Sequence, residues 1–251
     1  MTNQLLPSEW DVPQIFRDRL GDGPGRQRAM VADGHLLLVL HKVPQPGQLD
    51  REPRLLWRDA SGTWQSHEGG EGKAVLKQHL KEYDEVLQSL DAEEHKAVGS
   101  QQYLSVLTEL APVLRAARHL HSTLQEAREA VKDERALINA RDEAYRLERT
   151  MDLLVSDARG SLDVAALQQS EEQAASNLAM ARSAHRLNVL AAFFFPLATI
   201  SGILGVNFNH PLKDDPTFNP FYGMLGISLV CGFLLTLAIS RNPASTWTGR
   251  R

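Results

Sequence analysis

The chain has 251 residues, of which 43% are hydrophobic and 23% charged, and its formal net charge is −4 at pH 7. A nucleic-acid-binding protein carries a basic footprint, so the acidic balance argues against nucleic acid as a partner. The single cysteine, Cys231, excludes a disulfide framework and a Cys-x-x-Cys metal site.

The N-terminal part of the chain combines turn residues with short apolar runs. The segment Gly21–Arg26 is typical of a loop. Apolar runs flank Asp33-Gly34, and a second pair of runs flanks Ser61-Gly62. An Asp-Gly pair between apolar runs is a strong hairpin signal. We therefore predict two β-hairpins in a small sheet.

A helical pattern begins at about Glu71. Apolar residues recur every three or four positions as far as Leu90, which predicts a helix that ends at Gly99. We expect a second helix to begin near Pro112, because proline suits the first helical turn, and to continue to about Asp157.

The pair Gly160-Ser161 indicates a boundary between helices, because glycine favours a helix end and serine favours an N-cap. From Ser161 to Asn207 only Pro196 interrupts the helical pattern. A helix of that length spans about 70 Å at 1.5 Å per residue, and a bilayer core uses about 30 Å of it. The remainder is predicted to form a cytoplasmic stalk.

Two stretches in the last quarter of the chain contain no Asp, Glu, Lys or Arg. They are residues 187–212 and 216–240, which count 26 and 25 residues. A bilayer core needs about 20 apolar residues in a helix, and membrane helices tolerate a proline such as Pro196. We predict transmembrane helices at 187–206 and 221–240. The alternative is a buried hairpin of two soluble core helices.

Basic residues flank both predicted spans on the same side. They are Arg182, Arg186, Arg241, Arg250 and Arg251. The positive-inside rule then places both termini in the cytoplasm and the short loop at 207–220 outside. We expect a multi-pass protein of the cell (inner) membrane.

Residues at 3.5-residue intervals along the long helix form a seam that is mostly small or polar. We call this set the small-residue seam: Leu167, Ser170, Ala174, Asn177, Ala181, Ala184, Asn188, Ala191, Phe195, Ala198, Gly202 and Gly205. A coiled-coil core requires Leu, Ile or Val there. Either small residues let two membrane helices approach closely with no pore, or several copies surround a water-filled path. Asn188 favours the path, and Phe195 suits a hydrophobic constriction.

The segment from Pro196 to Asn207 reads PLATISGILGVN. It resembles the end of the first transmembrane helix in the CorA family of divalent-cation transporters. In that family a proline, a Gly-Ile pair and the tripeptide Gly-Met-Asn have the same spacing. The tripeptide here is Gly205-Val206-Asn207, and a short loop, a second apolar stretch and a basic C-terminus follow. The resemblance covers about a third of the chain, residues 161–241.

The resemblance implies a mainly α membrane protein that forms a homopentameric funnel. A small N-terminal α/β region would precede a long stalk helix, which continues into the first of two C-terminal transmembrane helices. The expected parts are the N-terminal region (1–98), a helical hairpin and stalk (99–186), the pore helix (187–206), the outer loop (207–220), the second span (221–240) and a cytoplasmic tail (241–251).

The resemblance also implies how an ion would be captured. A ring of Asn207 amides at the outer mouth would hold the hydrated ion, beside the backbone of Gly205 and Val206. Mg²⁺ gives up its water reluctantly, and neutral amide oxygens accept hydrogen bonds from that water without trapping the ion. Asp214 and Asp215 would raise the local cation concentration. The candidate pore-lining residues are Ala181, Ala184, Asn188, Ala191, Phe195, Ala198 and Gly202.

The sequence departs from the family pattern in two places that affect function. Val206 replaces the motif methionine, and relatives with another middle residue include zinc transporters of the ZntB type. The family's cytoplasmic pore end carries an asparagine and a large apolar gate, whereas Ala181 and Ala184 occupy those positions here. Phe195 is then the main candidate constriction. The carboxylates that could form regulatory metal sites are Asp157, Asp163, Glu171 and Glu172.

We expect a transporter of Mg²⁺ or a similar divalent cation and not an enzyme, because no nucleophile-elbow, Walker, HExxH or kinase signature is present. The membrane potential supplies about 2.3 kcal/mol per charge per 100 mV, so no ATP site is required. The expected partners are further copies of the chain, the lipid bilayer and the transported ion, with no cofactor. The alternatives are a Zn²⁺ or other metal transporter of the same family and a non-conducting, membrane-anchored coiled-coil scaffold.

Overall fold

The computed structural model describes residues 5–21, 23–45, 51–205 and 220–241. The chain divides into two units, Met1–Gln168 and Gln169–Arg251. A single helix, α4 (Arg135–Gly205), contributes residues to both units.

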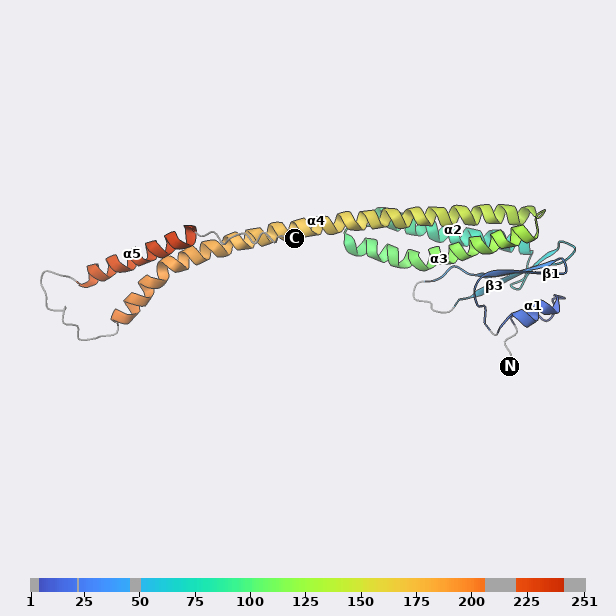
Figure 1. The fold of residues 1–251 in the computed structure, drawn as a ribbon, viewed down its shortest axis with the longest axis horizontal. Coiled ribbons are helices and arrows are strands. Elements are labelled where there is room, and N and C mark those ends of the chain that lie inside the picture. The colour runs from blue at the N-terminus through green and yellow to red at the C-terminus, as the bar shows by residue number, and fades with distance from the viewer. Residues whose placement is uncertain (1–4, 22, 46–50, 206–219, 242–251) are drawn as a thin grey trace. The chain divides into compact units, whose positions relative to one another are not determined.

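A four-stranded antiparallel sheet forms the centre of the first unit (Figure 1). Its strands are β1 (Arg28–Ala32), β2 (His35–His41), β3 (Pro53–Arg58) and β4 (Trp64–Ser66), and they pair in chain order. Both predicted hairpins are confirmed. In the first turn Asp33 and Gly34 both have positive φ, 50° and 77°, which is the backbone of the primed turns that match strand twist.

Both faces of the sheet are buried, because alternate side chains of each strand enter different cores. Leu37, Val39 and Leu55 pack against the N-terminal segment, which includes the short helix α1 (Gln14–Arg19). The opposite face contributes Leu38 and Leu56 to a larger core shared with the long helices. The first unit therefore has three layers: the N-terminal segment, the sheet and a helical layer.

Three helices make up the helical layer: α2 (Gly72–Lys96), α3 (Ser100–Ala130) and the first part of α4. An ion pair from Arg118 to Asp152 at 2.6 Å and a hydrogen bond between His121 and Glu148 at 2.6 Å join α3 to α4. Because the residue number rises on one helix as it falls on the other, these two helices are antiparallel.

A buried polar network joins β3 to α2. The Arg54 guanidinium donates to Glu68, to Glu82 and to Nδ1 of His79, at 2.9, 2.8 and 3.1 Å. Burial, together with the neighbouring Arg54 charge, lowers the pKa of His79 to about 3. The ring is therefore neutral at pH 7 and accepts the hydrogen bond from Arg54.

Glu134 joins the start of α4 to the sheet and to α2. Its carboxylate accepts hydrogen bonds from Arg58 and from the Trp64 indole, both at 3.3 Å, and pairs with Lys73 at 3.1 Å. Burial alone would raise the pKa of Glu134, but the three donors outweigh it, so the pKa lies below 4.5. Glu134 therefore stays ionised well into the acidic range.

Three predicted helix boundaries are wrong. Pro112 lies inside α3, which begins twelve residues earlier at Ser100. The helix expected to run on to Asp157 instead ends at Ala130, and the chain turns at 131–134 so that α4 can return along α3. Gly160 does not end a helix and Ser161 is not an N-cap, because α4 continues through both. The helix predicted to start at Glu71 and stop before Gly99 is confirmed as α2.

The second unit contains the C-terminal part of α4 and the helix α5 (Pro220–Arg241), so helices lie where both spans were predicted. The two helices approach closely at Gly232, where an added Cβ would lie 2.8 Å from the Phe193 carbonyl oxygen. Within the described parts of the chain, no helix is both long enough and apolar enough to cross a membrane.

Candidate functional site

One face of α4 in the second unit is covered by α5. The half-buried residues recur at helical spacing and are Val189, Ala192, Phe193, Pro196, Leu197 and Ile200. Gly232 of α5 lies against Phe193 in this stripe, and α5 runs beside this part of α4 in Figure 1. We call this stripe the α5-facing stripe.

The seven candidate pore-lining residues lie on another face of α4 and are all exposed. They are Ala181, Ala184, Asn188, Ala191, Phe195, Ala198 and Gly202. At 3.6 residues per turn they lie on roughly the opposite side of the helix from the α5-facing stripe. The Phe195 ring is 72% exposed. The structure therefore brings the seam residues onto one surface that α5 leaves open.

A third face of α4 carries large apolar side chains that are also exposed. Leu187 is 67% exposed, and Leu190 and Phe194 are more than half exposed. Large exposed apolar surfaces in a folded chain mark contact with lipid or with another protein. The second unit thus has one small-residue face and one bulky apolar face, in addition to the face that packs on α5.

The seam also runs along the part of α4 before the apolar stretch. Every residue from 166 to 188 is exposed, including the seam residues Leu167, Ser170, Ala174 and Asn177. No described element of the chain covers this stretch. A helix surface without any packed side chain depends on helix propensity and on contacts with other molecules.

Part of the predicted ion-capture site lies outside the described residues. These positions are Val206, Asn207, Asp214 and Asp215. Gly205, the first residue of the tripeptide, is the last residue of α4. The predicted roles of these residues stay predictions.

The four carboxylates suggested by type for regulatory metal sites lie along α4. Asp157, Asp163, Glu171 and Glu172 are all exposed. Among the described residues, no group of three or more His, Cys, Asp or Glu side chains is arranged to hold a metal ion.

Sequence reasoning missed the residues that fit α5 against α4. Ser228 and Gly232 are both buried on α5, at the four-residue spacing of small residues that lets membrane helices approach closely. That spacing was available in the sequence as Ser228-Leu-Val-Cys-Gly232 and indicates the face of α5 that could pack closely, but not the residues it would meet.

Comparison with known proteins shows the family to which this chain belongs. A family model described as CorA-like Mg²⁺ transporter protein matches residues 73–241, which is about two thirds of the chain. The chain belongs to the CorA family. It is therefore a divalent-cation transporter of that family and not an enzyme.

Solved structures show the same fold at low sequence identity. The cytoplasmic domain of ZntB from Vibrio parahaemolyticus RIMD 2210633 matches with a TM-score of 0.53 and 12% identity, over 64% of this chain and 80% of that one. The full-length CmaX protein matches with a TM-score of 0.53 and 15% identity, over 93% of this chain and 83% of that one.

A third match is the CorA magnesium transporter from Methanocaldococcus jannaschii. It has 15% identity and a TM-score of 0.43, over 89% of this chain and 81% of that one. That score is too low to support a comparison of folds. No curated protein sequence matches this chain. The likenesses at 0.53 support the CorA-like arrangement of an N-terminal α/β region followed by long helices.

Proposed function

We propose that this chain forms a homopentameric, channel-like pore that passes divalent cations down their electrochemical gradient, with Mg²⁺ as the first candidate ion. The proposal makes the CorA family function specific in its ion, its assembly and its residues. The observation that carries it is the part of the small-residue seam from Ala181 to Gly202, which is exposed on the side of α4 away from α5.

The geometry of α4 and α5 supports an axis lined by α4. If five copies of α4 surround an axis with their seams inward, the α5-facing stripe points outward and α5 forms the outer ring. Small side chains at Ala181, Ala184, Ala191 and Ala198 leave room for water along the axis. The bulky face with Leu187, Leu190 and Phe194 would then contact a neighbouring subunit or lipid.

Residues 187–206 and 221–240 are proposed as the membrane spans. Both stretches lack charged residues, and each is about as long as a bilayer core requires, roughly 20 residues in a helix. The flanking arginines favour cytoplasmic termini. The division of the chain at 98, 186, 206, 220 and 240 is kept as part of this proposal.

The chemistry of capture depends on Asn207. Five amide oxygens would accept hydrogen bonds from the water bound to Mg²⁺, which loses that water slowly, while Gly205 lets the five backbones come close together. Asp214 and Asp215 would attract cations electrostatically. Further along the path, Asn188 would offer polar contact.

Phe195 is proposed as the constriction. A ring of five phenyl groups would make a short apolar section, and such sections close a pore by expelling water. Replacement of Phe195 by alanine should widen this section and raise the resting flux, with no change in the amount of pentamer.

The test is Mg²⁺ uptake into proteoliposomes that contain the purified full chain, at an imposed inside-negative potential. The expected result is a potential-dependent flux that Asn207→Ala abolishes. Asn139→Ala, which changes the same residue type in the first unit and outside the seam, serves as the matched control and should keep the flux. The same assay with Zn²⁺, Co²⁺ and Ni²⁺ establishes the ion.

Two results would count against the proposal. Absence of any divalent flux from a folded pentamer would favour a non-conducting, membrane-anchored scaffold, which the alanines at positions 181 and 184 would also suit. A flux of Zn²⁺ without Mg²⁺ would keep the pore and change its ion.

A further inference from the structure

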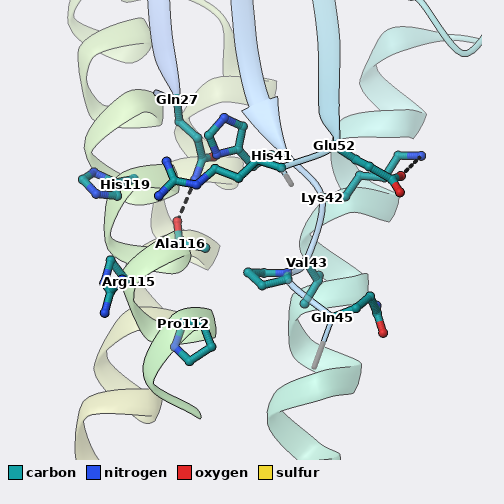
Figure 2. A pocket seen from close by; sticks show the side chains of 12 residues that line it. Gln27, His41, Lys42, Val43, Gln45, Glu52, Pro112, Arg115, Ala116 and His119 are labelled. Carbon is teal, nitrogen blue, oxygen red and sulfur yellow. Dashed lines mark hydrogen bonds and ion pairs between the residues drawn. The ribbon is translucent and has the colours of Figure 1, made fainter. Parts of the chain in front are cut away.

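A pocket of about 270 Å³ lies in the first unit, between the ends of β2 and β3 and one face of α3. Figure 2 shows side chains around it from Gln27, from the end of β2 and the segment after it, from the residues just before β3 and from α3. Its volume is just below the range of about 300–1,000 Å³ that is typical for drug-sized ligands, so a ligand here would be smaller. Neither the proposed pore nor the family motif uses this pocket.

Two buried side chains in the pocket each keep a hydrogen-bonding atom without a described partner. Gln27 donates its amide N–H to the Ala116 carbonyl at 2.8 Å (Figure 2), which leaves its Oε1 buried and unpartnered among the described residues. Nε2 of His41 is likewise buried with no described partner. The side chains are 94% and 95% buried, since their exposed fractions are 6% and 5%.

The free nitrogen of His41 is an acceptor. Burial and the nearby Arg51 charge lower the pKa of His41, while its hydrogen bond with the Gly25 backbone raises it; the net result is a lowered pKa and a neutral ring at pH 7. In a neutral ring one nitrogen carries hydrogen and the other accepts. In the tautomer that carries its hydrogen on Nδ1, the buried and unpartnered Nε2 accepts a hydrogen bond.

Positive charge surrounds these two acceptors. Arg51, two residues before β3, and Arg115 on α3 are exposed and have no partner among the described residues. His119 lies one turn beyond Arg115 on the same face of α3. Lys42 is different, because its ammonium already pairs with Glu68 at 2.8 Å and with Glu52 at 3.4 Å.

The two arginines and the two buried acceptors together restrict the chemical groups that a ligand of this pocket can carry. Two guanidinium groups favour a phosphate or a carboxylate, since both accept paired hydrogen bonds from arginine. A metal cation on His41 and Gln27 is disfavoured by the same arginines. The two buried acceptors require hydrogen-bond donors, and a hydroxyl group supplies them without adding positive charge. A buried acceptor without a hydrogen bond is unfavourable, so a ligand that supplies a donor there gains affinity.

We propose that this pocket binds a small anion that also carries hydroxyl groups, either a phosphate ester or a hydroxy acid. Arg51 and Arg115 bind the anionic group, and the Gln27 Oε1 and His41 Nε2 atoms accept hydrogen bonds from its hydroxyls. The site is separate from the proposed ion pathway and does not depend on it.

Calorimetric titration of the full chain in detergent tests this with two matched pairs of probes. Glycerol 3-phosphate is compared with propyl phosphate, and malate with succinate, so that each pair differs only in hydroxyl groups. We expect at least one hydroxylated probe to bind about tenfold more tightly than its partner, as one hydrogen bond to a buried acceptor provides. The pair in which the hydroxylated probe binds more tightly shows whether the anionic group is a phosphate or a carboxylate.

Substitutions connect the binding to this pocket. Arg115→Gln is exposed and should fold normally, and it should weaken the bound probe about tenfold. Lys77→Gln removes the same charge from the exposed face of α2, outside the pocket, and should leave the Kd unchanged. Gln27→Met should reduce the preference for the hydroxylated probe.

Three results would overturn the proposal. The first is no binding of any probe at about 10 mM, where a Kd near 1 mM is readily measured. The second is equal binding of the two probes within both pairs. The third is binding that Arg115→Gln leaves unchanged. The first would mean that ordinary water satisfies the two acceptors. The binding test with Arg115→Gln can be interpreted even if the Gln27→Met variant does not fold.

Discussion

The helix α4 contains two stretches with very different surroundings. In the first, up to Ala158, side chains at helical spacing are buried against α2 and α3, and Leu147 is 0% exposed. In the second, from 166 to 188, every residue is exposed. The backbone is the same continuous helix in both. The difference therefore lies in the partners: the first stretch finds them within its own chain, whereas no described element covers the second, and the proposed pentamer would supply its partners.

This contrast explains why composition changes along α4 while the helix does not end. The buried positions of the first stretch combine alanines with large apolar residues such as Leu147, Met151 and Leu154, whereas the seam of the second consists, apart from Leu167, of alanine, serine and asparagine. Small residues with good helix propensity, such as alanine, maintain a helix that buries little within one chain. They also allow several copies to come close. The same residues thus serve the helix and the proposed assembly.

The largest expected effect comes from the same substitution in the two stretches. Leu147→Ala removes a fully buried side chain and should lower the free energy of unfolding of the first unit by about 2–5 kcal/mol. Leu187 is 67% exposed in one chain. Leu187→Ala should therefore change the free energy of unfolding by less than about 0.5 kcal/mol. Thermal and denaturant unfolding followed by the fluorescence of Trp57 and Trp64 measures both. Equal losses would contradict the contrast.

Local signals in the sequence were sufficient for the hairpins and for α2. The turn at Asp33-Gly34 needs positive φ at both residues, and few residue pairs tolerate this, so two residues specify the turn. The apolar spacing of α2 is likewise local. These elements could be predicted because neighbouring residues determine them.

The boundaries of α3 and α4 could not be predicted in the same way. No glycine or proline marks the turn at 131–134. The chain turns there because Leu124 and Leu137 enter the same core, and because Glu134 finds three donors on other elements. Conversely, Gly160 costs α4 only about 1 kcal/mol relative to alanine, and packing of nearby Leu154 and Ala158 overrides that preference.

The seam could be predicted, but its relation to α5 could not. Periodicity along α4 identifies which residues share a face. It does not show which face α5 covers, since that depends on where Gly232 allows a close approach. The structure supplies this missing relation for the described residues of the seam.

The next largest effect concerns Glu134, which has partners from three other elements. Glu134→Gln should cost about 1.5–3 kcal/mol, because hydrogen bonds to a charged group are lost while the indole of Trp64 stays buried. Because the folded pKa lies below the ordinary 4.5, Glu134 contributes full stability above pH 4.5 and loses it as pH falls through the folded pKa. The variant should therefore lose less stability than the native chain on acidification below pH 4.5.

Unfolding at a series of pH values checks this expectation. Glu126→Gln is the control, since Glu126 is exposed on α3 and should leave both the stability and its pH dependence unchanged. If the Glu134→Gln variant and the native chain lose the same stability on acidification, other carboxylates determine how stability depends on pH.

The second unit offers a matched pair of glycines on α5. Gly232→Ala places a Cβ 2.8 Å from the Phe193 carbonyl oxygen, and such overpacking should cost about 1–3 kcal/mol of the contact between α4 and α5. Gly226→Ala meets nothing within 4 Å and should be neutral or slightly stabilising. The thermal stability of the detergent-solubilised oligomer, followed by size-exclusion chromatography after heating, measures both. A stable Gly232→Ala oligomer would show that this close contact is not required.

The smallest effect tests the first unit at a purely local feature. Gly34 has φ of 77°, and a Cβ there would meet Ala60 at an ordinary 3.5 Å, so backbone strain is the main cost of Gly34→Ala, about 1 kcal/mol. Gly34→Asn should cost less, because asparagine tolerates this conformation. Unfolding of both variants should show that order. If Gly34→Ala loses clearly more stability than Gly34→Asn, backbone strain at this turn is the cause. Equal losses of stability would mean that contacts with Ala60 are the cause. Either way the effect should leave ion flux unchanged, since this turn and the candidate pore-lining residues belong to different units.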